Sequence, residues 1–448
     1  MTIYLGDSTV YGHLWASDEG RDLLGEEARF ASWLEILACL AEAQAQVGLV
    51  PQPAARTIRK HLDGMELDLD RVGEGTRATG HSTLGLIRYL REELPSEVRE
   101  WVYYGATVQD VSDTWSALVM KGVGDLLERD LARLERAARA HAAEHRTTPM
   151  LGRTHAQPGI PISFGFKAAV WADEFARHRQ RLREGRRRWE VVQLGGALGT
   201  MEFWGQEAGP LLEAFAARLD LGVPTISWIT SRDRPAEFVL LLAMAVTTIA
   251  KIGNEIMELQ RLELGEVREP FIPGTVGSIT MPQKRNPEFS EHLDTLARLV
   301  RAQAAVMTEA MIQLHERDGR SWKAEWIALP QACTMTLAAT RFAVVLLEGL
   351  VVDRERMMEN IEARQGFVFG EPVMRALADR IGKHTAHDVV YEASMKGVES
   401  KVGFVEALLA DRRVTAHLDR EGIEGLFDLD RVLGAAPDFV DRVLGESA

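Results

Sequence analysis

Long stretches without proline are the feature of this sequence that most restricts its fold. The chain has 448 residues and 16 prolines, which leave several long windows free of proline. These windows are rich in Ala, Leu, Glu and Arg, which favour helix, whereas an interior proline removes a helical hydrogen bond and clashes with the preceding turn. We therefore predict an all-α protein built from long helices. The windows cover residues 96–148, 162–209, 236–269, 288–329 and 331–371.

Apolar residues within the first window repeat every three or four positions. Leu127, Leu131, Leu134 and Ala138 form one stripe on a surface otherwise covered by Arg and Glu, as expected for a helix that packs in a bundle. Alternation typical of strands is scarce and short, as at residues 226–229 and 351–352. Changes in composition divide the chain into an N-terminal helical domain (residues 1–104), a central helix-bundle domain (105–365) and a C-terminal helical domain (366–448).

Charge and cysteine content exclude several functional classes. The formal net charge is -14, which disfavours a general nucleic-acid or anionic-membrane surface. Cys39 and Cys333 are far apart, so we expect neither a disulfide framework nor a cysteine zinc site. Residues 1–15 lack the basic region and following apolar run of a signal peptide, so we expect none, and the apolar run at residues 238–250 is too short to span a membrane. We expect a cytoplasmic protein.

Two short motifs imitate cofactor sites. His141, Glu144 and His145 have the spacing of an inverted zinc-protease motif, but a metal needs a third protein ligand, and we interpret this segment as the end of a solvated helix. Residues 195–200 are rich in glycine but lack the register and the lysine of nucleotide-binding loops. We expect a close turn there, and neither a metal nor a cofactor in the protein.

Three polar segments between the long windows are better candidates for chemistry: residues 105–110, 152–158 and 274–287. The third combines glycines, backbone N–H groups before a helix start at Pro287, and the charge of Lys284, all of which suit a carboxylate. Ser278 among such donors could act as a base, because they stabilise its alkoxide. The alternative is a flexible surface loop with a capping serine and a solvated lysine.

The pattern Gly-Ser-x-x-Met-Pro-x-Lys-x-Asn-Pro at residues 277–287 resembles the signature loop of the fumarase/aspartase superfamily. The segment Thr107-x-Gln109-Asp110 is similar to the first signature region of that family, and Thr154-His155 to the second. The similarity continues through residues 259–267 and 315–317 and covers nearly the whole chain. Within the superfamily, the branch of adenylosuccinate lyase and 3-carboxy-cis,cis-muconate cycloisomerase is the most similar.

This resemblance implies a fold and a chemistry. The implied subunit has three mostly helical domains, and its central helices form a twenty-helix core in a homotetramer. Each active site would collect one signature segment from each of three subunits, without a cofactor or metal. The implied reaction is β-elimination on a small dicarboxylate: a base removes the proton beside one carboxylate, and an amine or oxygen departs to leave fumarate or an analogue.

The resemblance also assigns roles to individual residues. Ser278 occupies the position of the base, and His155 that of the acid that protonates a departing nitrogen. Arg317 has an alternative, since it could clamp a carboxylate or pair with Glu316 or Asp318 on a helix surface. The residues expected to bind substrate are Thr107, Gln109, Thr154, Lys284, Asn286, His81 and Arg317.

Departures from the family pattern bear on the substrate. Val108 and Ile279 stand where the family usually has a second hydroxyl. Residues 318–326 contain Trp322 and Trp326 and resemble the cycloisomerases rather than the segment that holds nucleotide phosphate, although we expect these two tryptophans to be core residues. The N-terminal Arg-Tyr nucleotide contact is replaced at residues 3–5. These differences disfavour AMP as the leaving group.

Our leading hypothesis is therefore a lyase that eliminates a nitrogen-linked group from an N-substituted aspartate and releases fumarate. The first alternative is a carboxymuconate cycloisomerase, and the second is adenylosuccinate lyase. A third alternative is a non-catalytic, crystallin-like relative, against which the intact Ser278, Lys284, Asn286 and His155 argue.

Overall fold

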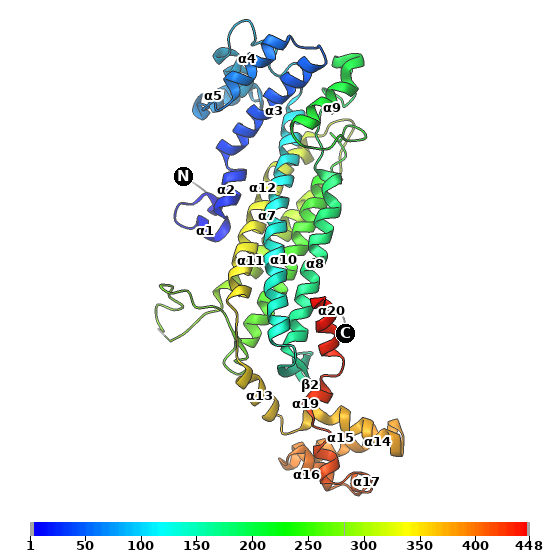
Figure 1. Cartoon of the computed structure of the whole chain (residues 1–448). Coiled ribbons are helices and arrows are strands. Elements are labelled where there is room, and N and C mark those ends of the chain that lie inside the picture. The colour runs from blue at the N-terminus through cyan, green and yellow to red at the C-terminus, as the bar shows by residue number, and fades with distance from the viewer. Residues whose placement is uncertain (1–3, 282, 446–448) are drawn as a thin grey trace. The chain divides into compact units, whose positions relative to one another are not determined.

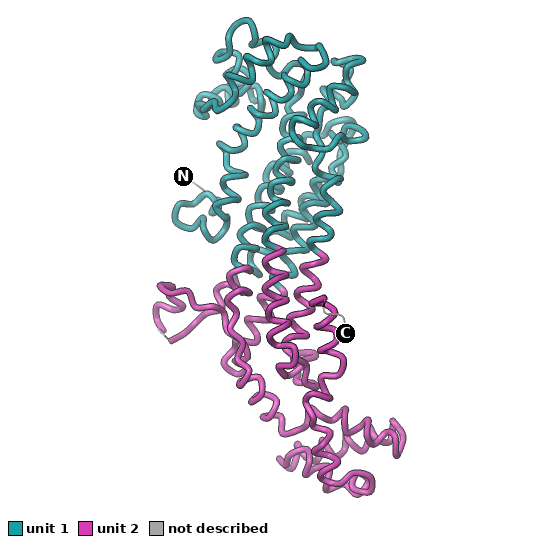
Figure 2. The backbone as a smooth tube through the Cα atoms, in the orientation of Figure 1, with its two compact units in different colours: residues 1–130, 178–250, 292–342 teal, residues 131–177, 251–291, 343–448 magenta. Residues whose placement is uncertain are grey.

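The computed structural model describes residues 4–281 and 283–445 and is predominantly helical (Figure 1). The prediction of an all-α fold is confirmed. Pro282 of the signature loop and Ile3 of the N-terminal segment lie outside the described residues. The chain forms two compact units: unit 1 comprises residues 1–130, 178–250 and 292–342, and unit 2 comprises residues 131–177, 251–291 and 343–448 (Figure 2). The division into three domains stays a prediction.

The long helices occupy the proline-free windows, and each contributes residues to both units. Helix α12 continues through Pro330, although the proline separates two of the windows. The buried residues Leu329 and Cys333 on either side hold the helix across the missing N–H group. The long helices are α7 (Val108–Glu144), α8 (Phe164–Trp189), α10 (Asp233–Leu259), α11 (Glu288–Glu309) and α12 (Gly319–Glu348).

Neighbouring long helices are joined by both apolar and polar contacts. In unit 1, Thr340 on α12 donates to Asp130 on α7 at 2.8 Å, and His178 on α8 contacts Thr248 on α10 at 2.9 Å. The predicted stripe on α7 is buried, which confirms its packing in a bundle. Its members Leu127, Leu131, Leu134 and Ala138 are each 0% exposed.

Helices α10 and α12 are long and apolar enough to cross a membrane, judged by length and composition only. About two thirds or more of each apolar window is buried inside the protein. Both therefore have the character of core helices.

Shorter helices complete unit 1. Helices α3 and α4 pack together, as do α5 and α6, and α9 packs on α3. The elements are η1 (Leu5–Asp7), α1 (Gly12–Trp15), α2 (Asp18–Leu24), α3 (Glu26–Gln46), α4 (Gln52–Leu62), α5 (Leu69–Thr79), α6 (Leu84–Glu93), η2 (Glu202–Glu207) and α9 (Ala208–Arg218).

The C-terminal helices of unit 2 enclose a core of their own. Val373, Leu377, Val389, Phe404 and Leu408 meet there, each 1% exposed or less. The helical elements are α13 (Arg354–Glu362), η3 (Phe367–Phe369), α14 (Gly370–Ile381), α15 (Lys383–Ser400), α16 (Phe404–Leu409), α17 (Arg412–Thr415), α18 (Arg420–Glu424), α19 (Leu429–Val432) and α20 (Ala436–Leu444).

Unit 2 also contains two small antiparallel pairs of strands. Strands β1 (Pro149–Thr154) and β2 (Gln157–Ser163) form a hairpin that the sequence patterns did not predict, because prolines and glycines interrupt its alternation. Strands β3 (Val267–Arg268) and β4 (Val351–Val352) form the second pair, so the strand expected at residues 351–352 is confirmed. The strand considered at residues 226–229 is absent from this described segment, which is irregular.

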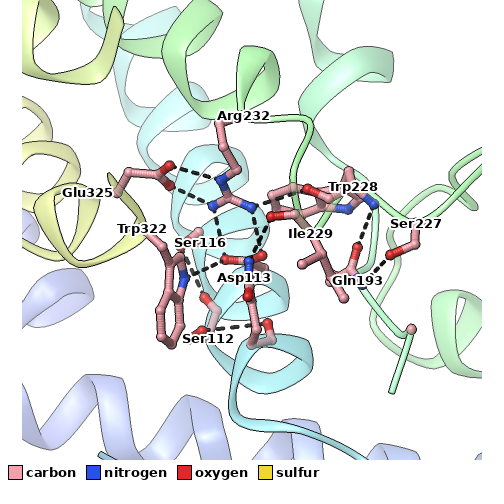
Figure 3. Close-up of polar contacts among 12 residues, drawn as sticks. Ser112, Asp113, Ser116, Gln193, Ser227, Trp228, Ile229, Arg232, Trp322 and Glu325 are labelled. Atoms are coloured by element: carbon pink, nitrogen blue, oxygen red, sulfur yellow. Dashed lines mark hydrogen bonds and ion pairs between the residues drawn. The ribbon is translucent and has the colours of Figure 1, made fainter. Parts of the chain in front are cut away.

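A buried ion cluster joins three segments of unit 1 (Figure 3). The Arg232 guanidinium donates to Asp113 on α7 at 2.7 and 3.0 Å and to Glu325 on α12 at 2.8 and 2.5 Å. The indole N–H of Trp322 donates to Asp113 at 3.2 Å, and Trp322 is buried, as predicted for a core residue. Burial raises the pKa of the Glu325 carboxyl, although Arg232 opposes this shift.

The histidine pair at the end of α7 differs from its predicted solvated state. His145 is only 3% exposed and packs against Phe164 with ring centroids 5.3 Å apart. His141 contacts the carbonyl oxygen of Leu347 at 2.8 Å. The prediction of a solvated segment is therefore wrong for His145, since Phe164 at the start of α8 packs against its ring and Thr148 contacts its Nδ1. Within residues 4–281 and 283–445, no group of three potential metal ligands occurs.

The buried His145 predicts a specific pH dependence of stability. Burial lowers the pKa of its imidazole from 6.5 to about 4. As the pH falls between these values, the unfolded chain takes up a proton that the folded chain excludes, so stability is lost. We expect His145→Gln to lose less unfolding free energy than the wild type over this range, measured by urea unfolding. Parallel curves for the two proteins would contradict this assignment.

Candidate active site

Thr107 and Arg317, two of the predicted binding residues, lie together in unit 1. Thr107 immediately precedes α7, and Arg317 precedes α12. The Arg317 guanidinium donates to the Thr107 hydroxyl at 3.0 Å and to the carbonyl oxygen of Gly196 at 3.3 Å. The alternative pairing with Glu316 or Asp318 does not occur among the described residues, and the Asp318 carboxylate accepts instead from Arg320 at 2.7 Å. The buried Nε–H of Arg317 has no partner within the described residues.

Asp110 organises this part of the site, a role not predicted from the sequence. Its carboxylate accepts the N–H groups of Thr107 at 2.9 Å, Gly195 at 2.7 Å and Gly196 at 3.1 Å. Burial raises its pKa to about 7, although these donors oppose the shift. The glycine-rich segment at residues 195–200 is thus a turn whose first two N–H groups bind Asp110. Thr107 and Asp110 have the spacing of a capping box, and this local signal could have revealed the bond between the Thr107 N–H and the Asp110 carboxylate.

Gln109 is buried and links the start of α7 to a distant segment of unit 1. Its side chain is only 1% exposed and donates to the carbonyl oxygen of Ile229 at 2.9 Å. The contact fixes the start of α7 against the segment before α10. A direct contact of Gln109 with substrate stays a prediction.

His81 lies elsewhere in unit 1, after the end of α5. It is exposed, and its Nδ1 accepts the backbone N–H of Thr83 at 3.3 Å. Its predicted role in binding substrate stays a prediction.

Thr154 and His155 lie at the tip of the β1–β2 hairpin in unit 2. Thr154 pairs with Gln157, so His155 and Ala156 alone form the turn, with φ of 52° and 61°. A two-residue turn with two positive φ values is normally made by Asn-Gly or similar pairs, because a Cβ is strained there. Both tip residues are exposed. The chain therefore exposes the His155 side chain on a strained backbone. Backbone strain of this kind is common at functional positions.

A buried ion pair anchors this hairpin one residue before Thr154. Arg153 donates to both carboxylate oxygens of Glu266, at 2.6 and 2.8 Å, and the Glu266 side chain is 0% exposed. Asn360 on α13 donates to the same carboxylate at 2.8 Å. A bidentate pair of this kind fixes orientation as well as position. The sequence placed Glu266 in a family motif but did not predict this contact.

Ser278, Lys284 and Asn286 share the long loop between β3 and α11 in unit 2. The Ser278 hydroxyl accepts the N–H of Met281 at 3.1 Å and is half-buried. Lys284 is exposed and makes no ion pair with any described residue. Asn286 donates to Glu288 at 3.4 Å. These contacts agree with a capping serine and a solvated lysine, and they leave the predicted roles of Ser278 as a base and of Lys284 as an anion-binding group as predictions.

The two ends of the loop are fastened together by Glu269. Its carboxylate accepts the N–H of Phe289 at 3.2 Å, and both the N–H and the hydroxyl of Ser290, at 2.9 and 2.6 Å. These are the first N–H groups of α11, where a carboxylate is stabilised by the helix dipole. These contacts therefore fix the two ends of the loop relative to each other.

The predicted site residues thus fall into two groups. Unit 1 contains Thr107, Gln109, His81 and Arg317, and unit 2 contains Thr154, His155, Ser278, Lys284 and Asn286. Within unit 1, Thr107 and Arg317 are in direct contact. Within unit 2, no hydrogen bond joins Ser278 to His155 in the described part of the chain.

Comparison with known proteins places these features in a family. Residues 15–302 match the family model described as lyase, and residues 366–443 match that of the adenylosuccinate lyase C-terminus. The N-acetyl-S-(2-succino)cysteine lyase of Dickeya dadantii is 36% identical over 445 residues, covering 99% of this chain and 98% of the relative. The 3-carboxy-cis,cis-muconate cycloisomerase of Pseudomonas aeruginosa is 36% identical, covering 95% and 94%.

A solved structure agrees with these sequence relatives. The crystal structure of fumarate lyase from Mesorhizobium sp. BNC1 is 35% identical and superimposes with a TM-score of 0.90, covering 96% of this chain and 98% of that one. The similarity therefore extends over both units and includes every signature segment.

Proposed function

Because the chain belongs to the fumarase/aspartase superfamily of lyases, in the branch of adenylosuccinate lyase and 3-carboxy-cis,cis-muconate cycloisomerase, we propose that it eliminates a group from a 2-substituted succinate and releases fumarate. The observation that carries this proposal is the loop of Ser278, Lys284 and Asn286. Its Ser278 oxygen already accepts an N–H group, from Met281 at 3.1 Å. Such a donor favours the alkoxide that a serine base requires.

The proposed reaction divides between the two groups of residues. Ser278 removes the proton from the carbon beside one carboxylate, and the electron pair forms the double bond as the bond to the leaving atom breaks. Lys284 and the loop N–H groups stabilise the negative charge that develops on that carboxylate. Arg317 and Thr107 bind the second carboxylate, since a guanidinium suits a carboxylate in geometry and charge. His155 donates a proton to the leaving atom.

The leaving atom could be nitrogen or sulfur, and the two differ in how much they need an acid. A nitrogen must be protonated as it departs, and the imidazole of His155 at the hairpin tip supports the nitrogen-linked group expected from the sequence. A sulfur can depart as a thiolate, whose conjugate acid has a pKa of about 8.5, with little help from an acid. The name of the Dickeya dadantii relative supports this thioether alternative. We therefore propose N- or S-succinylated amino-acid derivatives as the substrate class.

A substrate panel tests this proposal. We expect kcat/KM of ~10⁴–10⁸ M⁻¹s⁻¹ for the cognate member, and about tenfold or more below that for adenylosuccinate, since each lost charged contact costs roughly that factor. Arg320 is bound to Asp318, and Ser321 donates to Ile312, so neither offers a ready phosphate contact. The measurement is fumarate release from S-succinylcysteine derivatives, N-substituted aspartates and adenylosuccinate. Efficient cleavage of adenylosuccinate would contradict our interpretation.

The cycloisomerase is the second candidate function. It is supported by the Trp322 to Trp326 segment and by the Pseudomonas aeruginosa relative. Carboxymuconate therefore belongs in the same panel, followed by the loss of its conjugated chromophore. Reaction of the muconate alone would favour this candidate and would require another role for His155.

We also propose a cytoplasmic homotetramer whose active sites are shared between subunits. Large apolar side chains exposed on α10 and α12 support this assembly, with Leu240 41%, Met244 46% and Ile327 60% exposed. The two cysteines are free, which fits a reducing compartment.

Shared sites predict complementation between inactive variants. After reversible dissociation, mixed His155→Ala and Ser278→Ala subunits should regain part of the activity, because some hybrid sites receive both wild-type residues. Fumarate release before and after mixing is the measurement, and each variant dissociated and reassembled alone is the control. Full inactivity despite demonstrated subunit exchange would count against shared sites.

A further inference from the structure

A large cavity lies in unit 2 beside the hairpin that carries His155. Its volume is about 890 Å³, within the size range of small-molecule pockets. Thr154 and Gln157, the residues that flank the two tip residues, form one wall. The segment between α13 and η3 and the end of α15 form the others. The cavity therefore includes hairpin residues on both sides of the tip that carries His155.

Two cations on different segments line the cavity. Arg364 follows α13 and Lys401 follows α15, and both side chains are exposed. Neither forms an ion pair or a side-chain hydrogen bond with any group in residues 4–281 and 283–445. Glu371 is the single acid among the lining residues, and Phe367 and Val402 supply apolar surface. The cavity therefore combines a net positive charge with apolar walls, which suits an organic anion.

The backbone at the cavity rim also departs from what folding alone would favour. Lys401 caps the end of α15 with φ of 54°, and Gln365 has φ of 51°. Glycine is the usual residue with a positive φ after the end of a helix, because a Cβ is strained in this conformation. The chain thus keeps long polar side chains at two strained positions that face one cavity. Retained strain of this kind is typical of ligand-binding sites.

We propose that this cavity binds the leaving-group end of the substrate, an amino-acid derivative with a free carboxylate and an apolar body. Arg364 and Lys401 hold the carboxylate, and the apolar wall holds the body. The proposal rests on the proposed function for this choice of ligand class. It deepens that function by assigning a subsite outside the signature segments.

The test is direct binding to the full-length protein by titration calorimetry. The probes are N-acetyl-L-cysteine and its methyl ester, which differ in one negative charge. We expect the acid to bind about tenfold or more tightly than the ester, the factor expected for a charge-assisted hydrogen bond. Lys401→Gly and Arg364→Gln should each abolish most of this preference. Lys401→Gly is expected to fold well, because glycine relieves the strain at this position.

A matched control is Lys383→Gln, which removes a cation from the start of the same helix α15, away from the cavity lining. It should keep the wild-type preference for the acid. Equal binding of acid and ester, no binding of either, or an unchanged preference in both cavity variants would overturn the proposal. Binding needs no turnover, so a protein that binds the acid in this way but releases no fumarate would support the cavity site and reject the proposed function.

Discussion

Replacing Ser278 by alanine is expected to lower kcat by about 10²–10⁴, the contribution typical of a positioned general base. The proton beside a carboxylate is weakly acidic, so its removal becomes much slower when the positioned acceptor is lost. Substrate affinity should change little, because the proposed carboxylate-binding residues Lys284, Arg317 and Thr107 are all retained. Steady-state kinetics of fumarate release on the cognate substrate, together with substrate binding to the inactive variant, separate the two effects.

The same loop provides a control for this variant. Thr275 donates its hydroxyl to Ile272 at 2.7 Å, in a local contact within the loop. Thr275→Ala therefore removes a hydroxyl from the same loop without removing the proposed base, and kcat should stay near the wild-type value. An Ser278→Ala enzyme with near-wild-type turnover would reject Ser278 as the base.

Replacing Arg232 by leucine is expected to destabilise the protein by about 3–5 kcal/mol, the usual cost of breaking a buried ion pair by removing one partner. Arg232 and Asp113 have side chains only 1% exposed, and Glu325 only 5%. The variant leaves two carboxylates buried without a cation, so they must take up protons or draw in water. The measurement is the free energy of unfolding in urea, followed by circular dichroism.

An exposed pair in the same unit serves as the control for Arg232. Arg91 and Glu100 are joined at 2.7 Å, but their side chains are 50% and 67% exposed. Water and salt screen such pairs, so Arg91→Leu should cost only about 0–1 kcal/mol. Similar losses in the two variants would show that the cluster drawn in Figure 3 does not hold α7 and α12 together.

The helical fold was predictable because its signals are local. Proline-free windows and the stripe of Leu127, Leu131 and Leu134 depend on residues close in sequence, and the structure confirms both. Local signals also explain the errors. Prolines concealed the β1–β2 hairpin. The charged neighbours of His145 suggested a solvated segment, whereas His145 is buried and packs against Phe164 of α8.

The contacts of the candidate site were less predictable, because they join distant segments. Asp110 meets Gly195 and Gly196 about 85 positions later, and Arg153 meets Glu266 across 113 positions. No periodicity relates such residues, so only the folded chain brings them together. The sequence did indicate which segments carry the site, since small, polar, glycine-containing stretches between long helices have little role in a helical core.

The most direct test of the central claim is to count the fumarate formed for each substrate molecule consumed. The wild-type protein would be incubated with S-succinylcysteine derivatives, N-substituted aspartates and carboxymuconate, and the products measured by NMR spectroscopy. We predict one fumarate and one free thiol or amine for each succinylated molecule lost. Consumption of substrate without fumarate, as in cycloisomerisation, or no consumption of any succinylated member by a folded protein would contradict the account.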